Sequence, residues 1–258
     1  MPRFAANLSM LFTEHRFPER FDHAAKAGFT AVEFLFPYDE DIDAIAEALK
    51  RNILELVLFN LPAGDFSSGE RGIANDPGRT QAFRAGVSAA LEIADRLACT
   101  RLNCLSGLTS PDPPRETQMA TLRDNLRFAA DACSRAEIRL VVEPLNTIDT
   151  PGFILSTAAN GLALISEIDH PNLALQLDIY HAYMMGEDPL ALIRDSMSQI
   201  GHVQIADSPG RHQPGTGTID FGPIFTALDR ADYSGWVSLE YRPEGETVSS
   251  LAWLDAYR

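Results

Sequence analysis

The sequence predicts an α/β protein built as a single (β/α)8 barrel, a TIM barrel, and three observations support this prediction. Short apolar runs alternate with longer segments of helical periodicity, and the alternation occurs eight times along the chain. The 258 residues, divided among eight units, give about 32 residues for each strand and helix, and single α/β barrels often occupy ~250 residues. No low-complexity linker divides the chain, so we expect residues 1–258 to form one domain.

The eight predicted strands are short runs dominated by apolar residues. Strands that are separated by helices pair in parallel through right-handed crossovers, and eight such units can close a barrel. The strands are predicted at 3–8, 31–36, 53–59, 100–104, 139–143, 173–178, 202–205 and 236–240.

The predicted helices have apolar residues on one face, as in the segment that carries Phe83, Val87 and Ala90. The first helix also has a stop signal, because Gly28 follows its last apolar position. The helices are predicted at 18–27, 41–51, 77–97, 115–135, 157–168, 188–200, 221–230 and 249–257. An open doubly wound sheet is the alternative, but the chain has neither of the glycine-rich phosphate-binding motifs that such sheets often carry.

One connection stands out because of its length and composition. Residues 60–76 are rich in Gly, Ser and Asp, and they are long for a link between a strand and the next helix. Long ordered connections of this kind are often functional, so we predict that residues 60–76 form an active-site lid and not a domain boundary.

The charge of the chain excludes one class of partner. Thirty-six acidic residues against 21 basic ones give a net charge of −15 and a sequence pI of about 4.7. Nucleic-acid binding needs clustered Lys and Arg, so we expect no nucleic-acid partner. If the substrate is an anion, a local cation must hold it.

The cysteines and the chain's hydropathy bear on its location. Three cysteines, Cys99, Cys104 and Cys133, form no CxxC motif, and an odd number of thiols favours a reduced, cytoplasmic protein. The first residues lack the pattern of a signal peptide, and no run approaches ~20 apolar residues. We therefore expect no membrane association.

Four of the later predicted strands end in, or contain near their end, an oxygen-bearing side chain. These residues are Glu143, Asp178, Gln204 and Glu240, separated by 35, 26 and 36 residues. In a barrel the chemistry lies where strands end, so these side chains should converge at the mouth. Such a set suits a divalent cation that prefers oxygen, Mg²⁺ or Mn²⁺. The alternative is that polar residues simply cap strands at a solvated rim.

At these residues the chain resembles the hydroxypyruvate isomerase family, within the xylose-isomerase-like barrels. The matching stretches span nearly the whole chain in order. They are FAANLSML (4–11), VEFLFPY (32–38), NLPAGD (60–65), GERGIA (69–74), VEPLN (142–146), DIYH (178–181), GHVQIAD (201–207), PGTG (214–217) and WVSLEY (236–241).

The resemblance implies an aldose–ketose isomerase that interconverts hydroxypyruvate and tartronate semialdehyde through an enediolate. Glu143 and Glu240 then match the general acid/base pair and also contact the metal, and Asp178 and Gln204 match the other two metal ligands. Related ketose epimerases usually have His where Gln204 stands. This difference favours the hydroxypyruvate isomerase branch, and it also weakens the case for a metal.

Three further residues are candidates for binding the substrate. Arg211, in the loop after Gln204, is the best candidate for the local cation, because its guanidinium can pair with a carboxylate; the alternative is a solvated loop arginine. Arg71, in the predicted lid, is a second candidate. His181, expected on the loop after Asp178, could hydrogen-bond a substrate oxygen, or it could be a histidine at a helix start that faces solvent.

Other functions remain open at this point. A 2-oxo-tetronate isomerase would use the same acid/base pair on a longer 2-oxo acid, and a ketose 3-epimerase is disfavoured by Gln204. A metal-dependent endonuclease would need a His-rich site and a basic face, whereas this chain has six His and a strong negative charge. A barrel without catalytic activity is the remaining class. We expect a small anionic hydroxy-oxo acid as the partner, and a homo-oligomer is compatible with such a barrel.

Overall fold

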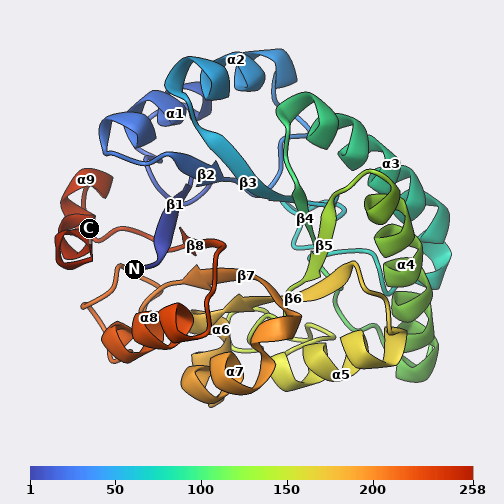
Figure 1. Cartoon of the computed structure of the whole chain (residues 1–258). Coiled ribbons are helices and arrows are strands. Elements are labelled where there is room, and N and C mark those ends of the chain that lie inside the picture. The colour runs from blue at the N-terminus through green and yellow to red at the C-terminus, as the bar shows by residue number, and fades with distance from the viewer. Residues whose placement is uncertain (258) are drawn as a thin grey trace.

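Eight parallel strands close into a barrel in chain order, and the first strand pairs with the last (Figure 1). The fold is described from a computed structural model, which covers residues 1–257. The strands are β1 (Arg3–Asn7), β2 (Ala31–Glu33), β3 (Glu55–Asn60), β4 (Arg101–Cys104), β5 (Arg139–Val142), β6 (Leu173–Asp178), β7 (Ile200–Ile205) and β8 (Trp236–Leu239). The predicted (β/α)8 barrel is confirmed.

Helices surround the barrel and bury their apolar faces against it (Figure 1). Five of these helices begin at a side-chain cap, from Asp41, Thr157, Asp178, Asp188 or Asp220. The helices are α1 (Phe17–Lys26), α2 (Ile42–Asn52), α3 (Thr80–Leu97), α4 (Arg115–Arg135), α5 (Ala158–Ile168), α6 (Ile179–Met184), α7 (Pro189–Ser196), α8 (Phe221–Arg230) and α9 (Thr247–Ser250). Short 3₁₀ turns are η1 (Pro77–Arg79), η2 (Met197–Gln199) and η3 (Ala252–Ala256).

The inside of the barrel changes from apolar to polar along each strand. Small apolar residues, among them Ala5, Val141 and Ala174, form a buried cluster of their own. Side chains two residues apart lie on the same face of a strand, so the inward position after Ala5 is Asn7 and the one after Val141 is Glu143. The carboxyl ends of the strands therefore carry a buried polar layer above an apolar floor.

Several predicted boundaries are wrong, and the reasons are local. The predicted helix 188–200 ends at Ser196, because a 3₁₀ turn follows and β7 already begins at Ile200. The strand predicted at 53–59 begins in the structure at Glu55, two residues later than predicted. The reason is that Ile53 adopts a left-handed conformation that ends α2. Residues 179–184 form a helix, α6, that the sequence pattern did not predict.

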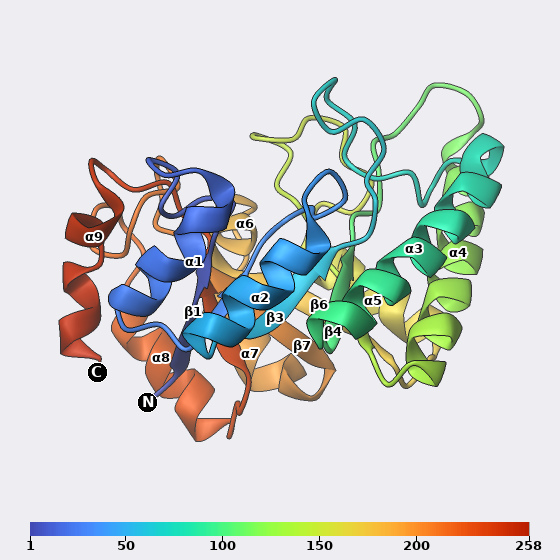
Figure 2. The same cartoon turned by 90° about the horizontal axis from the view of Figure 1, so that it is seen from above.

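The predicted lid belongs to a group of long connections on one side of the barrel (Figure 2). Gly72 has a φ of 106°, and a Cβ there would meet the backbone oxygen of Leu105 at 2.1 Å. Asn75 donates a hydrogen bond to the backbone of Leu108, which in turn pairs with Phe153. The connections after β3, β4 and β5 thus support one another. That residues 60–76 act as a lid stays a prediction.

Within residues 1–257, every helix is too short or too polar to cross a lipid bilayer.

Candidate active site

A cavity of about 930 Å³ opens at the carboxyl ends of the strands. Parallel barrels place their functional groups at this face, because the strands deliver side chains there and the loops can vary. Its lining includes five of the residues predicted from the sequence: Arg71, Glu143, His181, Arg211 and Glu240.

Three buried carboxylates gather around the guanidinium of Arg211; Glu143 and Glu240 line the cavity, whereas Asp178 lies behind its lining. Nη2 of Arg211 lies 3.2 Å from Oδ2 of Asp178 and 3.1 Å from Oε2 of Glu240. Glu143 faces the same space and accepts a hydrogen bond of 2.8 Å from Nδ2 of Asn103. The three carboxylates are at most 5% exposed, so solvent and salt screen their mutual repulsion poorly. The positive charge of Arg211 offsets this repulsion.

Burial and mutual repulsion raise the pKa values of these carboxyl groups. Burial, together with the charge of Asp178, raises the pKa of Glu143 to about 8, although Arg211 opposes the shift. Burial also raises the pKa of Asp178, and it holds that of Glu240 well above its ordinary value. Perturbed acids in a cavity are typical of sites that move protons near neutral pH.

Arg211 is placed at this centre by an unusual backbone turn. Its φ is 58°, and its guanidinium lies 5.3 Å from the ring centre of Tyr180. Burial lowers the pKa of Arg211, but the charges of Glu240 and Asp178 outweigh burial and raise it overall. The arginine that the sequence predicted as a substrate ligand therefore already neutralises two carboxylates in this structure.

Gln204 lies at the same end of the barrel but makes different contacts. Its Oε1 accepts a hydrogen bond of 2.6 Å from Gln176, and its Nε2 donates one of 2.7 Å to Glu33. Glu33 also accepts hydrogen bonds from Asn7 and from Nε2 of His202. Burial by itself raises the pKa of Glu33, but the hydrogen bond and the charge of His202 outweigh burial, and the pKa is lowered overall. This polar network fixes the orientation of the Gln204 amide.

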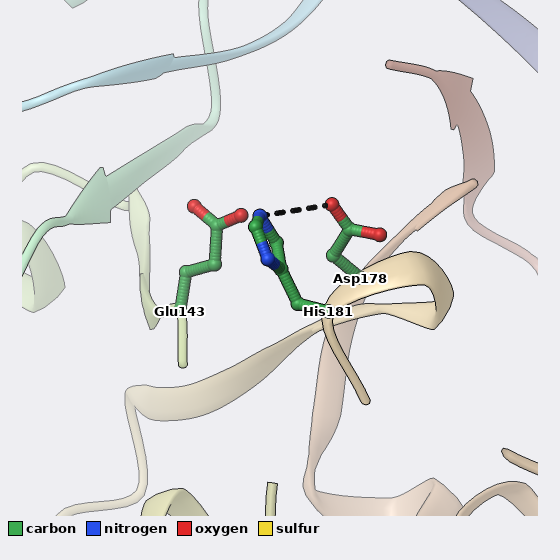
Figure 3. Close-up of side chains that lie close together, drawn as sticks. All are labelled: Glu143, Asp178 and His181. Atoms are coloured by element: carbon green, nitrogen blue, oxygen red, sulfur yellow. Dashed lines mark ion pairs between the residues drawn. The ribbon is translucent and has the colours of Figure 1, made fainter. Parts of the chain in front are cut away.

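His181 lies between Glu143 and Asp178 (Figure 3). It was expected on a loop, but it belongs to helix α6 and is buried, not facing solvent. Its Nε2 is 3.6 Å from Oδ2 of Asp178 and makes no hydrogen bond to any of residues 1–257. Burial, and then the charge of Arg211, lower the pKa of His181 well below its ordinary value.

Arg71 reaches the cavity from the predicted lid. Its guanidinium stacks 3.9 Å from the ring centre of Phe66, and its Nη1 donates to the backbone oxygens of Phe66 and Glu70. None of the ion pairs formed by residues 1–257 involves Arg71. Arg71 is therefore a cavity-lining cation that no carboxylate neutralises within the described chain.

The donor set fits a divalent cation that prefers oxygen. One ligand atom from each of Glu143, Asp178 and His181 lies within 4.8 Å of the others, so this buried triad could bind a metal. Oε2 of Glu240 is also buried; within residues 1–257 it is ion-paired with Nη2 of Arg211 but accepts no hydrogen bond of good geometry. Carboxylate oxygens are the ligands that Mg²⁺ and Mn²⁺ prefer. The identity of the ion stays a prediction.

Sequence reasoning did not assign roles to three polar residues that the structure places against the site. Asn103 bonds Glu143, Gln176 bonds Gln204, and Asn146 contacts the ring of His181. Asn103 and Gln176 stand at inward positions of otherwise apolar strands. A polar residue at an inward position was the signal in the sequence that could have identified both. Asn146 ends the VEPLN stretch and had no signal beyond that motif.

Comparisons with known proteins bear on the whole chain. A family model described as "Xylose isomerase-like TIM barrel" matches residues 21–257. The chain is 46% identical over 258 residues to "Hydroxypyruvate isomerase" of Escherichia coli (strain K12), with 100% of both chains covered. It is 41% identical over 257 residues to "2-oxo-tetronate isomerase" of Cupriavidus necator, covering 100% of this chain and 99% of that one. A structure described as "AP endonuclease, family 2 from Brucella melitensis" has a TM-score of 0.97 at 46% identity, with 100% of both chains covered.

Proposed function

Because the chain belongs to the xylose isomerase-like TIM barrel family, we propose that it is an isomerase interconverting hydroxypyruvate and tartronate semialdehyde. This is an aldose–ketose interconversion, an intramolecular oxidoreduction. The observation that carries the proposal is the gathering of Glu143, Asp178 and Glu240 around Arg211 in the barrel mouth. A full-length relative named for this reaction supports the choice of substrate.

The reaction moves a proton between adjacent carbons, and two glutamates suffice for it. One glutamate removes a proton from C3 of hydroxypyruvate and leaves an enediolate. The other returns a proton to C2, and the hydroxyl proton passes from O3 to O2. A carboxyl group whose pKa is about 8, as burial makes that of Glu143, exchanges protons readily near neutral pH. We assign Glu143 and Glu240 as the acid/base pair.

A divalent cation belongs to this proposal as a cofactor. Glu143, Asp178, Gln204 and Glu240 are the residues that would hold Mg²⁺ or Mn²⁺. When bound, the cation supplies positive charge that stabilises the negative charge of the enediolate. Gln204 is oriented by Gln176 and Glu33, and its Oε1 retains one lone pair, because a carbonyl oxygen can accept two hydrogen bonds.

The substrate is a small anion, and we assign its contacts to three residues. Arg71 is the candidate for the carboxylate, because it lines the cavity and no carboxylate of residues 1–257 pairs with it. Arg211 neutralises Asp178 and Glu240, and it adds positive charge close to the reacting carbons. His181 directs Nε2 into the same space and can meet a substrate oxygen.

The closest alternative substrate is 2-oxo-tetronate. A cavity of about 930 Å³ has room for one more hydroxymethyl group, and one full-length relative carries the name 2-oxo-tetronate isomerase. Sugar 3-epimerisation remains disfavoured by Gln204. The Brucella structure is described as an AP endonuclease, so cleavage of abasic DNA is a further alternative. The net charge of −15 disfavours it.

A cytoplasmic location also belongs to the proposal. Its support is the state of the three cysteines, which are buried and unpaired, as expected for a reducing compartment. Fractionation of the source cells tests this point.

A homo-oligomer stays a prediction, and sedimentation tests it.

The function is tested by assaying both 2-oxo acids in D₂O, with Mg²⁺ or with EDTA, and abasic duplex DNA in parallel. We expect isomerisation with solvent deuterium at carbon and no DNA cleavage. Glu143→Gln and Glu240→Gln should each lose a factor of about 10²–10⁴ in kcat, because each removes a proton-transfer group. The exposed Glu244→Gln is the matched control and should retain activity. Absence of isomerisation and of deuterium exchange with both acids would sink the proposal.

A further inference from the structure

Asn146, the last residue of the VEPLN stretch, contacts the imidazole of His181 with two groups. Its backbone N–H donates to Nδ1 of His181 at 3.1 Å, and its side-chain Nδ2 lies 2.7 Å from the same nitrogen. Both residues are buried, and Asn146 is fully so. The side of the ring that faces away from the cavity is therefore occupied by Asn146.

The orientation of the Asn146 amide follows from its other partners. Oδ1 accepts hydrogen bonds from the backbone N–H groups of Ile148 at 3.0 Å and Asp149 at 2.8 Å, so that atom must be the oxygen. Nδ2 donates one hydrogen to Oδ2 of Asp149 at 3.1 Å. Its second hydrogen remains for His181, and Nδ1 of His181 therefore faces two donors.

A nitrogen that faces two donors must act as an acceptor, and in neutral histidine the proton then resides on the other ring nitrogen. We propose that Asn146 is a positioning residue that holds His181 as a neutral imidazole with its proton on Nε2, so that His181 meets the substrate as a hydrogen-bond donor and not the metal as a ligand.

The surroundings of Nε2 agree with this assignment. Nε2 makes no hydrogen bond within residues 1–257, and it lies between the carboxylates of Glu143 and Asp178 (Figure 3). A free N–H at this place can donate to an oxygen that gains negative charge during the reaction. Histidines that bind metals usually donate their other N–H to an oxygen, whereas the other nitrogen of His181 accepts.

The inference rests on the proposed function only for the oxygen that Nε2–H meets. The tautomer itself is a property of the protein without substrate. The tautomer assignment can therefore be wrong although the protein is an isomerase. Equally, the protein can lack isomerase activity although the tautomer assignment is right.

The first test is a ¹⁵N NMR spectrum of the full-length protein labelled at histidine, with His181 assigned by comparison with His181→Gln. Couplings to the ring protons identify which nitrogen carries hydrogen. We expect a protonated Nε2 and an unprotonated Nδ1 at pH 8. A proton on Nδ1 of the unmodified protein overturns the proposal.

The second test exchanges donor and acceptor in the pair Asn146/Asp149. Asn146→Asp combined with Asp149→Asn keeps one carboxylate and one amide in contact, but it places an oxygen against Nδ1. We expect Nδ1 of His181 to become protonated in this double variant, whereas Asp149→Asn alone should leave it unprotonated. The backbone N–H of residue 146 is the same in both variants, so an unchanged Nδ1 in the double variant, or a shifted one in the single variant, contradicts the role of the Asn146 side chain.

A third test uses Mn²⁺ binding, measured by calorimetry on the protein without substrate. Because the proton on Nε2 leaves no lone pair for a metal, His181→Gln should change the dissociation constant of Mn²⁺ by less than threefold. Asp178→Asn serves as the comparison, and it should weaken binding at least tenfold. A tenfold loss in His181→Gln would make the histidine a ligand and overturn the proposal.

Discussion

Glu143 shows how the fold prepares a single side chain for proton transfer. An ordinary glutamate is charged at neutral pH, but burial and the neighbouring charge of Asp178 raise the pKa of this one to about 8. Asn103 supports its carboxylate and Arg211 limits the shift. The residue type is visible in the sequence, whereas the pKa depends on neighbours from other strands.

The raised pKa of Glu143 predicts how stability depends on pH. Between pH 4.5 and about 8 the folded protein holds a proton at Glu143 that the unfolded chain releases, so the free energy of unfolding should fall as pH rises through this window. One proton corresponds to a slope of at most about 1.4 kcal/mol per pH unit. Urea unfolding at a series of pH values, carried out on the metal-free native protein and on metal-free Glu143→Gln, measures this slope.

The variant provides the control in that experiment, because it retains Asp178 and Glu240 but cannot titrate at position 143. A shallower slope in Glu143→Gln is the expected result. Equal slopes in the two proteins would show that Glu143 does not carry a raised pKa.

At the scale of elements, the loop that carries Arg211 is organised by one buried carboxylate. Oδ1 of Asp207 accepts hydrogen bonds from the backbone of Ser208 and Ile219, and Oδ2 accepts from Gly215 and Gly217 at 2.8 Å each. A Cβ at Gly217 would lie 2.1 Å from the backbone oxygen of Ser208, so glycine is required there. The PGTG stretch, which the sequence marked as a match to the family, wraps around Asp207.

Asp207→Asn should loosen this loop. The amide replaces one acceptor oxygen and leaves two backbone N–H groups unpaired, which costs about 2–6 kcal/mol at about 1–3 kcal/mol for each group. We expect faster hydrogen exchange at Gly215 and Gly217 and a lower kcat/KM, because Arg211 loses its placement. Asp220→Asn is the matched control, since an N-cap needs one acceptor and asparagine supplies it. Equal exchange rates in Asp207→Asn and the native protein would contradict this role.

The end of helix α2 contains a strained residue. Ile53 has a φ of 53° and is 86% exposed, so a β-branched side chain occupies a left-handed position with little burial to offset the cost. Ile53→Gly should raise the free energy of unfolding by ~1 kcal/mol. Ile53→Val keeps the branch and should change it little. Urea unfolding measures both, and a destabilised glycine variant would contradict the argument.

At the scale of the whole molecule, the net charge of −15 opposes the approach of an anionic substrate. The cations that line the cavity act locally, and salt screens the longer-range repulsion between the protein and the substrate. We therefore expect kcat/KM for hydroxypyruvate to rise with NaCl concentration between 10 and 200 mM, with kcat unchanged. Steady-state kinetics checks this, and a fall in kcat/KM would mean that the local cations dominate the approach.

Much of the architecture could be predicted because it depends on local pattern. Eight alternations of apolar runs and helical segments gave the barrel, and the strand ends placed Glu143, Asp178, Gln204 and Glu240 on one face. Helix α6 was missed because a segment of six residues is too short for a clear helical period. Boundaries such as that of β7 shifted, because pairing with neighbours and not periodicity sets where a strand begins.

The sequence by itself determined the barrel, the residue types at its mouth and the acidic character of the chain, because periodicity and composition are properties of consecutive residues. The tertiary structure alone decided which groups meet. It placed Arg211 between Asp178 and Glu240, bound the Gln204 amide to Gln176 and Glu33, and set Asn146 against His181. Charge, pKa and tautomer depend on atoms a few ångströms apart in space, and those neighbours come from distant parts of the chain.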